Sequence, residues 1–396
     1  MNACILLHEE IATACPHIHN ARLSALLDVT DTACKYQKCS LTGLGRTLIS
    51  SAKTKHCIKK IDRLLGNSHL QSERKDIYKA LASRFVQVGS YPVILIDWSQ
   101  INEEAGFHIL RASLASEGRA ITLYEEVHPK NKSHNREVHG AFLDVLQYIL
   151  PADVQPLLIT DAGFKNPWFK QVQRKGWYWL GRIRHFTQFK TQDTEKWIPC
   201  RSLNDLATNN PTYLGRIELA KRNAIVCCAH LYKKPLQGRT KRTQGKRVSQ
   251  RTNSRSYSAR EREPWFLVTN IPHEKLSSNQ AVALYTTRMQ IEENFRDTKN
   301  QRIGLSLKES KSRTEQRLEI LLLVVFLATH ILWLIGIKAT SVGLHKHYQA
   351  NTIRDRAVLS MFNLGLQVLR KQPELIHLFL LKELMEIVHS KGKLWN

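Results

Sequence analysis

Short, nearly continuous apolar runs in the middle of the chain predict buried strands. Residues 92–96 and 156–160 have the apolar character expected of central strands that are covered on both faces. Each run is followed by an aspartate, Asp97 and Asp161. An acid at the end of a buried strand is costly unless it binds a cation or caps a helix, and ligands of open α/β folds bind at that edge of the sheet. Both aspartates are therefore candidate site residues.

The pattern from residue 93 to residue 184 predicts three strands, a helix, a strand, a helix and a strand. The elements that accompany the two runs above are expected at residues 107–115, 120–127, 135–150, around Trp168, and at 177–183. About 100 residues then precede the next helix, far more than one connection needs. They contain expected strands at residues 213–219, 224–231 and 265–269. The fold class is therefore α/β, with an inserted, mainly β subdomain.

The first 85 residues have a helical pattern. A helix capped by Thr54 and stopped by Gly66 has an apolar face made of Cys57, Ile58, Ile61, Leu64 and Leu65. Four basic side chains lie largely on the other side: Lys55, Lys59, Lys60 and Arg63. Because LTGLGRTL precedes this helix, we interpret the pair as a DNA-binding unit of helix-turn-helix style. A plain basic amphipathic helix is the alternative.

The last hundred residues also predict helices. Residues 320–337 carry no formal charge over 18 positions, which is long enough for a membrane span. A helix packed beneath a sheet is apolar all round for the same reason, and we favour this interpretation over the membrane. Amphipathic helices are expected at residues 352–370 and 373–388.

The segment YTTRMQIEENFRDTK, residues 285–299, carries charge in a pattern that suits a site. In a helix of about 100° per residue, one stripe contains a carboxylate flanked by cations: Tyr285, Arg288, Glu292, Arg296 and Lys299. A solvated helix with ordinary charge pairs is the alternative. Together with the strand-end aspartates, Glu292 completes a set of three carboxylates. Such a set suits hard ions such as Mg²⁺, and two of these ions about 3.5–4 Å apart can support in-line phosphodiester displacement.

Composition favours a nucleic-acid partner. The chain has 59 Lys and Arg against 34 Asp and Glu, a formal net charge of +25, and a pI near 9.8. Residues 233–263 alone contain 11 basic and 2 acidic residues, so this loop is expected to contact phosphates, with a solubilising loop as the alternative. The eight cysteines form no C-x-x-C pair and no signal peptide is recognised, which predicts a cytoplasmic protein in a reducing compartment.

The motifs resemble one family over nearly the whole chain: the DDE transposases of bacterial insertion sequences, specifically the insertion-sequence-four family and its insertion-sequence-ten-like members. The block at residues 285–299 fits the family's Tyr-Arg-Glu-Lys pattern at Tyr285, Arg288, Glu292 and Lys299. The other matching stretches are TKHCIKKIDRLLGN, VILIDWS, TDAGFKNPW, GWYWLGRIR, EPWFLVTNIP and QANTIRDRAVLS.

The resemblance implies an RNase H-like catalytic core at residues 86–184 and 281–340, in which the first and fourth strands are neighbours. It implies an N-terminal all-α DNA-binding domain at 1–85, an insertion subdomain at 185–280 and a C-terminal helical region at 341–396. Asp97, Asp161 and Glu292 are implied ligands of two Mg²⁺ ions, with Mn²⁺ as a substitute. The implied partners are double-stranded DNA, both terminal inverted repeats and target, and a second copy of the chain in a homodimeric synapse.

The resemblance also assigns DNA contacts. Tyr285, Arg288 and Lys299 are expected to hold phosphates, and Trp265 to stack on a base flipped out of the duplex end. A strand-core tryptophan is the alternative for Trp265. Trp98 is assigned no role beyond its proximity to Asp97.

The implied activity is cut-and-paste transposition through strand cleavage, hairpin formation and strand transfer. An RNase H-like nuclease acting on structured nucleic acid is one alternative. A catalytically inactive protein that binds the element ends and represses transposition is another. Glu293 is the alternative to Glu292 as the acid, and we favour Glu292 because only it lies on the stripe.

Overall fold

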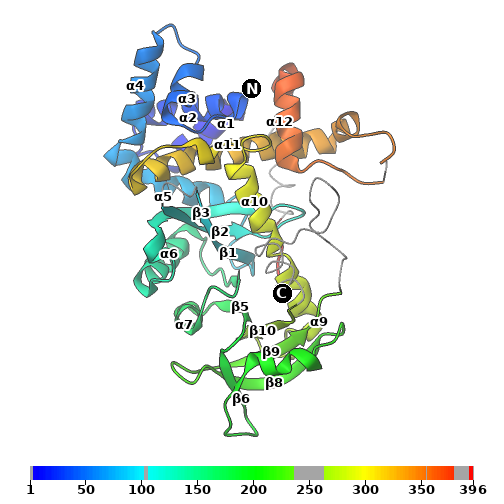
Figure 1. Ribbon diagram of the computed structural model, residues 1–396. Coiled ribbons are helices and arrows are strands. Elements are labelled where there is room, and N and C mark those ends of the chain that lie inside the picture. Colours follow the sequence, from blue (N-terminus) through cyan, green and yellow to red (C-terminus); the bar gives the residue numbers. More distant parts are fainter. Residues whose placement is uncertain (1–2, 102–105, 236–262, 354, 379–391, 396) are drawn as a thin grey trace, which may run out of the picture. The chain divides into compact units, whose positions relative to one another are not determined.

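The computed structural model describes residues 3–101, 106–235, 263–353, 355–378 and 392–395 (Figure 1). The chain forms two compact units. The first comprises Met1–Val154 and Met289–Asn396, and the second comprises Gln155–Arg288. Most of the predicted basic loop, residues 236–262, lies outside the described residues, as do residues 379–388 of the helix predicted at 373–388. The described residues of that helix, Pro373–Leu378, form a 3₁₀ helix.

The first unit combines a three-stranded sheet with helices. Its antiparallel strands, in the spatial order β3-β2-β1, are β1 (Val93–Gln100), β2 (Phe107–Leu114) and β3 (Ile121–Pro129). Its helices are α1 (Ala3–Ala14), α2 (Asn20–Tyr36), α3 (Leu41–Thr47), α4 (Thr54–Leu65), α5 (Ser68–Ala82), α6 (Arg136–Ile149), α10 (Met289–Lys299), α11 (Glu315–Ser341) and α12 (Met361–Lys371). Short 3₁₀ helices occupy Lys130–Lys132, Leu307–Glu309, Leu344–Tyr348 and Pro373–Leu378.

Helix α11 forms the centre of the first unit. It runs between the N-terminal helices and the three-stranded sheet (Figure 1). The helix is long and apolar enough to cross a membrane, with a mean hydropathy of 2.7 over its most apolar 18 residues. However, 89% of that stretch is buried inside the structure. An apolar surface on all sides is what a helix needs when protein surrounds it. The burial therefore fits the core helix favoured from the sequence.

The second unit is mainly β. Strand β4 (Leu157–Thr160) pairs in parallel with β5 (Tyr178–Ile183), and the other pairs are antiparallel. From β5 the sheet continues through β10 (Trp265–Thr269), β9 (Ile225–Tyr232), β8 (Thr212–Leu219), β6 (Gln188–Thr191) and β7 (Ile198–Pro199). Its helices are α7 (Asn166–Arg174), α9 (Ser278–Thr286) and the 3₁₀ helix Cys200–Leu206. The structure is thus of mixed α/β class.

Three local predictions were wrong. Strand β1 does not end before Asp97 but continues to Gln100, because its pairing with β2 runs on to His108. Thr54 does not cap α4: the helix begins at Thr54 itself, and Lys53 at the cap position makes no capping hydrogen bond, although Gly66 does end the helix. The helix expected at 352–370 begins only at Met361.

The reason for the late start of α12 is a loop held by Gln349. Its Nε2 donates to the carbonyl oxygens of Ile353, at 2.7 Å, and Arg356, at 3.1 Å. The helix then begins at Met361 and is capped by Ser360, whose side-chain oxygen accepts a hydrogen bond from the Asn363 amide.

The helix expected over residues 285–299 is interrupted. The amides of Thr287 and Arg288 bond to carbonyls three residues back, those of Leu284 and Tyr285, which closes a turn at the end of α9. Helix α10 then starts at Met289, and the boundary between the two units falls at the same point. A single stripe from Tyr285 to Lys299 is therefore wrong, while Glu292 and Lys299 remain on one helix.

The predicted domain bounds differ from the two units. Helices α1 to α5 precede the first described strand, as expected for the N-terminal region. They nevertheless belong to the same unit as the β1–β3 sheet. A separate all-α domain at residues 1–85 therefore stays a prediction.

Candidate active site

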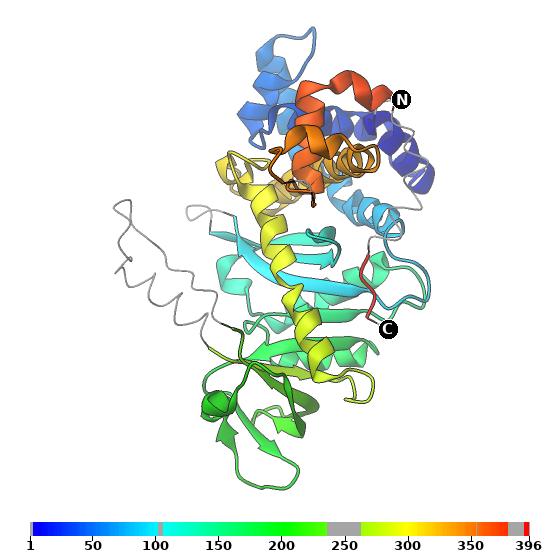
Figure 2. The same cartoon turned by 90° about the vertical axis from the view of Figure 1, so that its right-hand side faces the viewer.

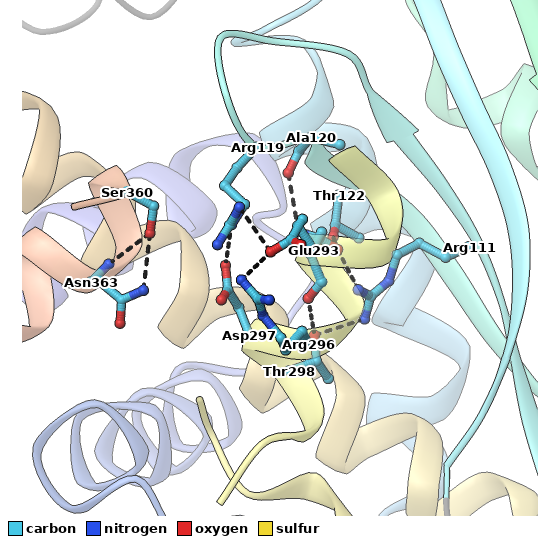
Figure 3. A network of polar contacts seen from close by, with 11 residues as sticks. Arg111, Arg119, Ala120, Thr122, Glu293, Arg296, Asp297, Thr298, Ser360 and Asn363 are labelled. Atoms are coloured by element: carbon cyan, nitrogen blue, oxygen red, sulfur yellow. Dashed lines mark hydrogen bonds and ion pairs between the residues drawn. The ribbon is translucent and has the colours of Figure 1, made fainter. Parts of the chain in front are cut away.

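The two adjacent glutamates of α10 have different surroundings. Glu293 forms ion pairs with Arg119, at 3.1 Å, and with Arg296 (Figure 3). Arg119 also bonds to Asp297 at 2.9 Å, so this side of α10 is tied to the turn before β3. Glu292 is exposed. The surroundings therefore give Glu293 a structural role and favour Glu292 as the acid of the site.

A buried polar network fixes α10 against β2 and β3. The guanidinium of Arg111 contacts Glu125 of β3 and both Asn294 and Thr298 of α10. Asn294 in turn donates to the carbonyl oxygen of Ala120 at 3.0 Å. This network was not predicted from the sequence. A signal for it was present, since an arginine and a glutamate within strands that are otherwise largely buried must be paired.

Lys299 links α10 to β1. Its Nζ donates to Ser99 Oγ at 2.6 Å and to the Gln100 carbonyl at 3.0 Å. The pKa of Lys299 is lowered to about 8, mainly by burial and also by the charges of Arg111 and Lys308, while Asp97 opposes the decrease. Glu292 and Lys299 are seven residues apart, so they lie on one face of α10, which crosses the sheet of the first unit (Figure 2). The first unit thus gathers Asp97 and Lys299 between β1 and α10, with Glu292 on the same helix face.

Asp97 is half-buried in β1, and its Oδ1 accepts a hydrogen bond from the Trp98 amide at 2.8 Å. Trp98 points to the opposite face of the strand, where its indole Nε1 donates to His139 Nε2 at 3.2 Å. Burial lowers the pKa of His139 to about 4, with further lowering from His134. In this structure Trp98 therefore packs against α6, behind the strand that carries Asp97.

The other predicted residues lie in the second unit. Asp161 directly follows β4, and its Oδ1 accepts from the Gly163 amide at 2.8 Å, which forms a tight turn. Tyr285 is buried, and its ring centroid lies 4.9 Å from that of Trp265 in an edge-on arrangement. Burial raises the pKa of Tyr285, Arg288 and Arg182 lower it, and Asp161 raises it. The second unit thus gathers Asp161, Tyr285, Arg288 and Trp265.

Trp265 is partly exposed at the start of β10. Its ring lies edge-on to Tyr232, at 5.6 Å, as well as to Tyr285. An indole that is partly exposed and supported by two phenol rings is compatible with stacking on a base.

Helix α4 carries a basic groove beside α2. Lys55, Lys59 and Arg63 are exposed, and the last two line a hollow of about 660 Å³. The residues around this hollow are largely polar or basic: His19, Ala21, Arg22, Ala25, His56, Lys59, Lys60, Arg63, Leu64 and Asn67. We call this hollow the α2–α4 groove. Its charge suits a phosphate backbone.

The carboxylates fit a divalent cation by their chemistry, since Asp97, Asp161 and Glu292 offer only hard oxygen donors. Among the residues that the structure describes, no three His, Cys, Asp or Glu side chains gather closely enough to ligate one ion. Asp161 belongs to the second unit and the other two acids to the first. The shared site therefore stays a prediction.

A family model described as "Transposase DDE domain" matches residues 89–329, which is more than half of the chain. The chain belongs to this family of DDE transposases, and its mixed α/β structure is consistent with an RNase H-like transposase core. DNA is accordingly its partner, and divalent metal ions are general in the family. No curated protein matched the chain.

Proposed function

We propose that this transposase moves an insertion sequence of the insertion-sequence-four family by cutting at its terminal inverted repeats and joining the freed ends to target DNA. The observation that carries the proposal is the arrangement of α10, which keeps Lys299 beside Asp97 on β1 while Glu293 is occupied by Arg119 and Arg296. The acid Glu292 is on the face of α10 that also carries Lys299. A phosphate held by Lys299 would lie beside Asp97, with Glu292 about two helical turns away on the same face of α10.

Asp97, Asp161 and Glu292 would hold two Mg²⁺ ions, or Mn²⁺ in their place. The ions would lower the pKa of an attacking water or 3′-hydroxyl and stabilise the leaving oxygen. The remaining tasks belong to side chains. Tyr285, Arg288 and Lys299 would bind the phosphates beside the cleaved bond.

Hairpin formation would follow the first cut, as the released 3′-hydroxyl attacks the opposite strand. Trp265 would support this tight bend by stacking on an unpaired base, worth about 1–3 kcal/mol. The α2–α4 groove would bind the terminal repeat through the exposed Lys59 and Arg63 on α4, with Lys55 on the same helix. A homodimer would pair the two ends before cleavage.

The test uses the DNA that flanks the gene. Purified protein is incubated with Mg²⁺ and a labelled duplex that ends in the flanking inverted repeat, and the products are separated on a denaturing gel. We expect a product that runs at twice the strand length, the hairpin, and its absence with Asp161→Ala.

Two outcomes contradict the proposal. Cleavage that ignores the repeat sequence would favour the nuclease, and binding without cleavage by the unmodified protein would favour the repressor.

A further inference from the structure

The buried ion pair between Arg111 and Glu125 lies directly beside the strand that carries Asp97. Arg111 is 1% exposed and Glu125 is fully buried. In the register of the sheet, Arg111 of β2 is opposite Asp97 of β1 on one side and opposite Glu125 of β3 on the other. Directly opposed residues project from the same face, with Cβ atoms about 4.5–5.5 Å apart. The arginine therefore stands between two carboxylates.

The Arg111 guanidinium forms its ion pair with Glu125 and not with Asp97. Its Nε donates to Glu125 Oε2 at 2.8 Å, and its Nη2 lies 2.5 Å from the same oxygen. Nη2 also donates to Thr298 Oγ1 at 3.1 Å, and Nη1 donates to Asn294 Oδ1 (Figure 3). Glu125 and α10 thus hold the guanidinium by all three of its nitrogen atoms and turn it toward β3 and α10.

The orientation of Arg111 toward Glu125 has a consequence for Asp97, the carboxylate on the other side of the arginine. An arginine opposite a carboxylate readily forms a two-point ion pair. Such a pair at Asp97 would occupy the oxygens that a divalent cation needs. Lys299 and Arg74 add positive charge around Arg111 and Glu125. In the described part of the chain, Glu125 is the carboxylate with which the Arg111 guanidinium forms its ion pair.

We propose that Glu125 is a positioning residue that acts through Arg111: it keeps the guanidinium off the Asp97 carboxylate, whose oxygens the divalent cation would need. The inference rests on the proposed function, in which Asp97 is a metal ligand. Arg111 has a second task in the same arrangement, because its bonds to Asn294 and Thr298 set α10 against β2.

The test compares two variants that break the same ion pair from opposite sides. Glu125→Gln releases the guanidinium, whereas Arg111→Met removes it. Both should lower stability, since removal of either partner leaves an unpaired buried group. Their effects on the metal should differ. Mn²⁺ binding to the full chain, without DNA, is measured by electron paramagnetic resonance, with folding checked by circular dichroism.

We expect Glu125→Gln to weaken Mn²⁺ binding about 10- to 100-fold, the range typical of residues behind a metal ligand. Arg111→Met should bind Mn²⁺ at least as tightly as the unmodified chain, and Arg111→Met combined with Glu125→Gln should restore the affinity. Asn294→Ala removes one acceptor while both charges stay paired. It serves as a milder variant should Glu125→Gln fail to fold, and we expect a severalfold loss.

The controls distinguish a failure of the proposed metal site from a failure of the role assigned to Glu125. Asp97→Asn should abolish the same Mn²⁺ signal. If it does not, the metal site itself is wrong and the inference falls with it. If Asp97→Asn abolishes the signal while Glu125→Gln and Asn294→Ala bind normally, only the inference is wrong. Equal losses in Glu125→Gln and Arg111→Met, without recovery in the double variant, would show a purely structural role and overturn it.

Discussion

The functional residues of the first unit are distinguished by their surroundings more than by their chemistry. Glu292 and Glu293 are neighbours of identical type, yet Glu293 is partly buried and paired with Arg119 and Arg296, whereas Glu292 is exposed. Arg111 and Lys299 are both cations near Asp97, yet Arg111 is paired with Glu125, whereas Lys299 bonds to β1 and has a pKa lowered to about 8, mainly by burial. These differences lead to two predictions at the scale of single side chains.

Substitution of the two glutamates should give opposite results. Glu292→Gln should abolish cleavage of the repeat-ended duplex without loss of stability, because this side chain is exposed. Glu293→Gln should keep most of the activity but lower the free energy of unfolding by about 1–3 kcal/mol, because Arg119 loses a charged partner. Gel assays and urea unfolding measure the two effects. The reverse pattern would transfer the catalytic role to Glu293.

DNA binding should depend on the protonation of Lys299. Burial favours the neutral amine, with a pKa of about 8 in the free protein, whereas a bound phosphate favours the charged form. Affinity for the cleavage site should therefore fall as the pH rises above about 8, by up to about tenfold per unit. Lys299→Arg should remove this dependence, since arginine stays charged. Identical pH profiles for both proteins, measured by fluorescence anisotropy, would contradict the role of Lys299.

At the scale of elements, the orientation of α4 depends on its close approach to α3. A Cβ atom at Gly45 would lie 2.6 Å from Ile58 Cα, closer than two carbon atoms can approach. The two helices can be this near only because residue 45 has no side chain. The basic side of α4, which carries Lys55, Lys59 and Arg63, is thereby set in place.

Gly45→Ala should therefore push α3 and α4 apart. We expect a loss of about 1–3 kcal/mol in unfolding free energy and weaker binding to the terminal repeat. Gly66→Ala is the matched control, because its Cβ would meet no atom closer than 3.6 Å and its φ is −95°. Gel-shift assays compare the two. If Gly45→Ala binds the repeat as well as Gly66→Ala, the position of α4 does not determine recognition.

The sequence predicted elements best where apolar runs are bounded by turn residues. Strand β10, Trp265–Thr269, has the predicted bounds, and β4 ends at Thr160 directly before Asp161 as expected. Strands β6 and β7 were missed, because four and two residues are too few to establish an alternating pattern. The interruption before Met289 was also missed, since residues 285–299 contain no glycine or proline to mark a helix end.

The acids of the candidate site could be proposed from the sequence, but the residues that surround and support them could not. Asp97, Asp161 and Glu292 could be proposed from one-dimensional spacing and motif. The link between Arg111 and Asn294 joins residues that are far apart in the chain, and periodicity contains no information on such a pairing. The same holds for the hydrogen bond from Lys299 to Ser99.

At the scale of the whole molecule, buried histidines should limit stability in acid. Burial lowers the pKa of His330 on α11 to about 3, with a further contribution from Arg84, and burial lowers that of His230 to about 4. A histidine whose pKa is lowered by folding stabilises the fold above its unfolded value, about 6.5, and this contribution is lost as the pH falls toward the folded value.

The free energy of unfolding should accordingly decrease below pH 6.5, by up to about 1.4 kcal/mol per pH unit for His330 alone. His330→Leu should make the decrease shallower. Urea unfolding at pH 7.5, 6.0 and 5.0 measures the slope. The same slope with and without His330 would show that this histidine does not control acid stability.

The chemistry proposed for the molecule needs both units, since Asp97 and Glu292 belong to the first and Asp161 to the second. Metal rescue tests this shared site most directly. A cysteine at a ligand position offers a soft thiolate, which Mg²⁺ binds poorly and Mn²⁺ accepts better. Asp97→Cys, Asp161→Cys and Glu292→Cys are assayed on the repeat-ended duplex with each ion, and Glu293→Cys is the control.

We predict that Asp97→Cys and Asp161→Cys lose cleavage in Mg²⁺ and regain part of it in Mn²⁺, and that Glu292→Cys behaves in the same way. Glu293→Cys should cleave with Mg²⁺ and show no preference for Mn²⁺ beyond that of the unmodified chain. Rescue at Asp97 and Asp161 together would place acids of both units on one metal site. Full activity of Asp161→Cys in Mg²⁺, or no rescue at either aspartate, would contradict the proposal that these acids bind the catalytic metal ions.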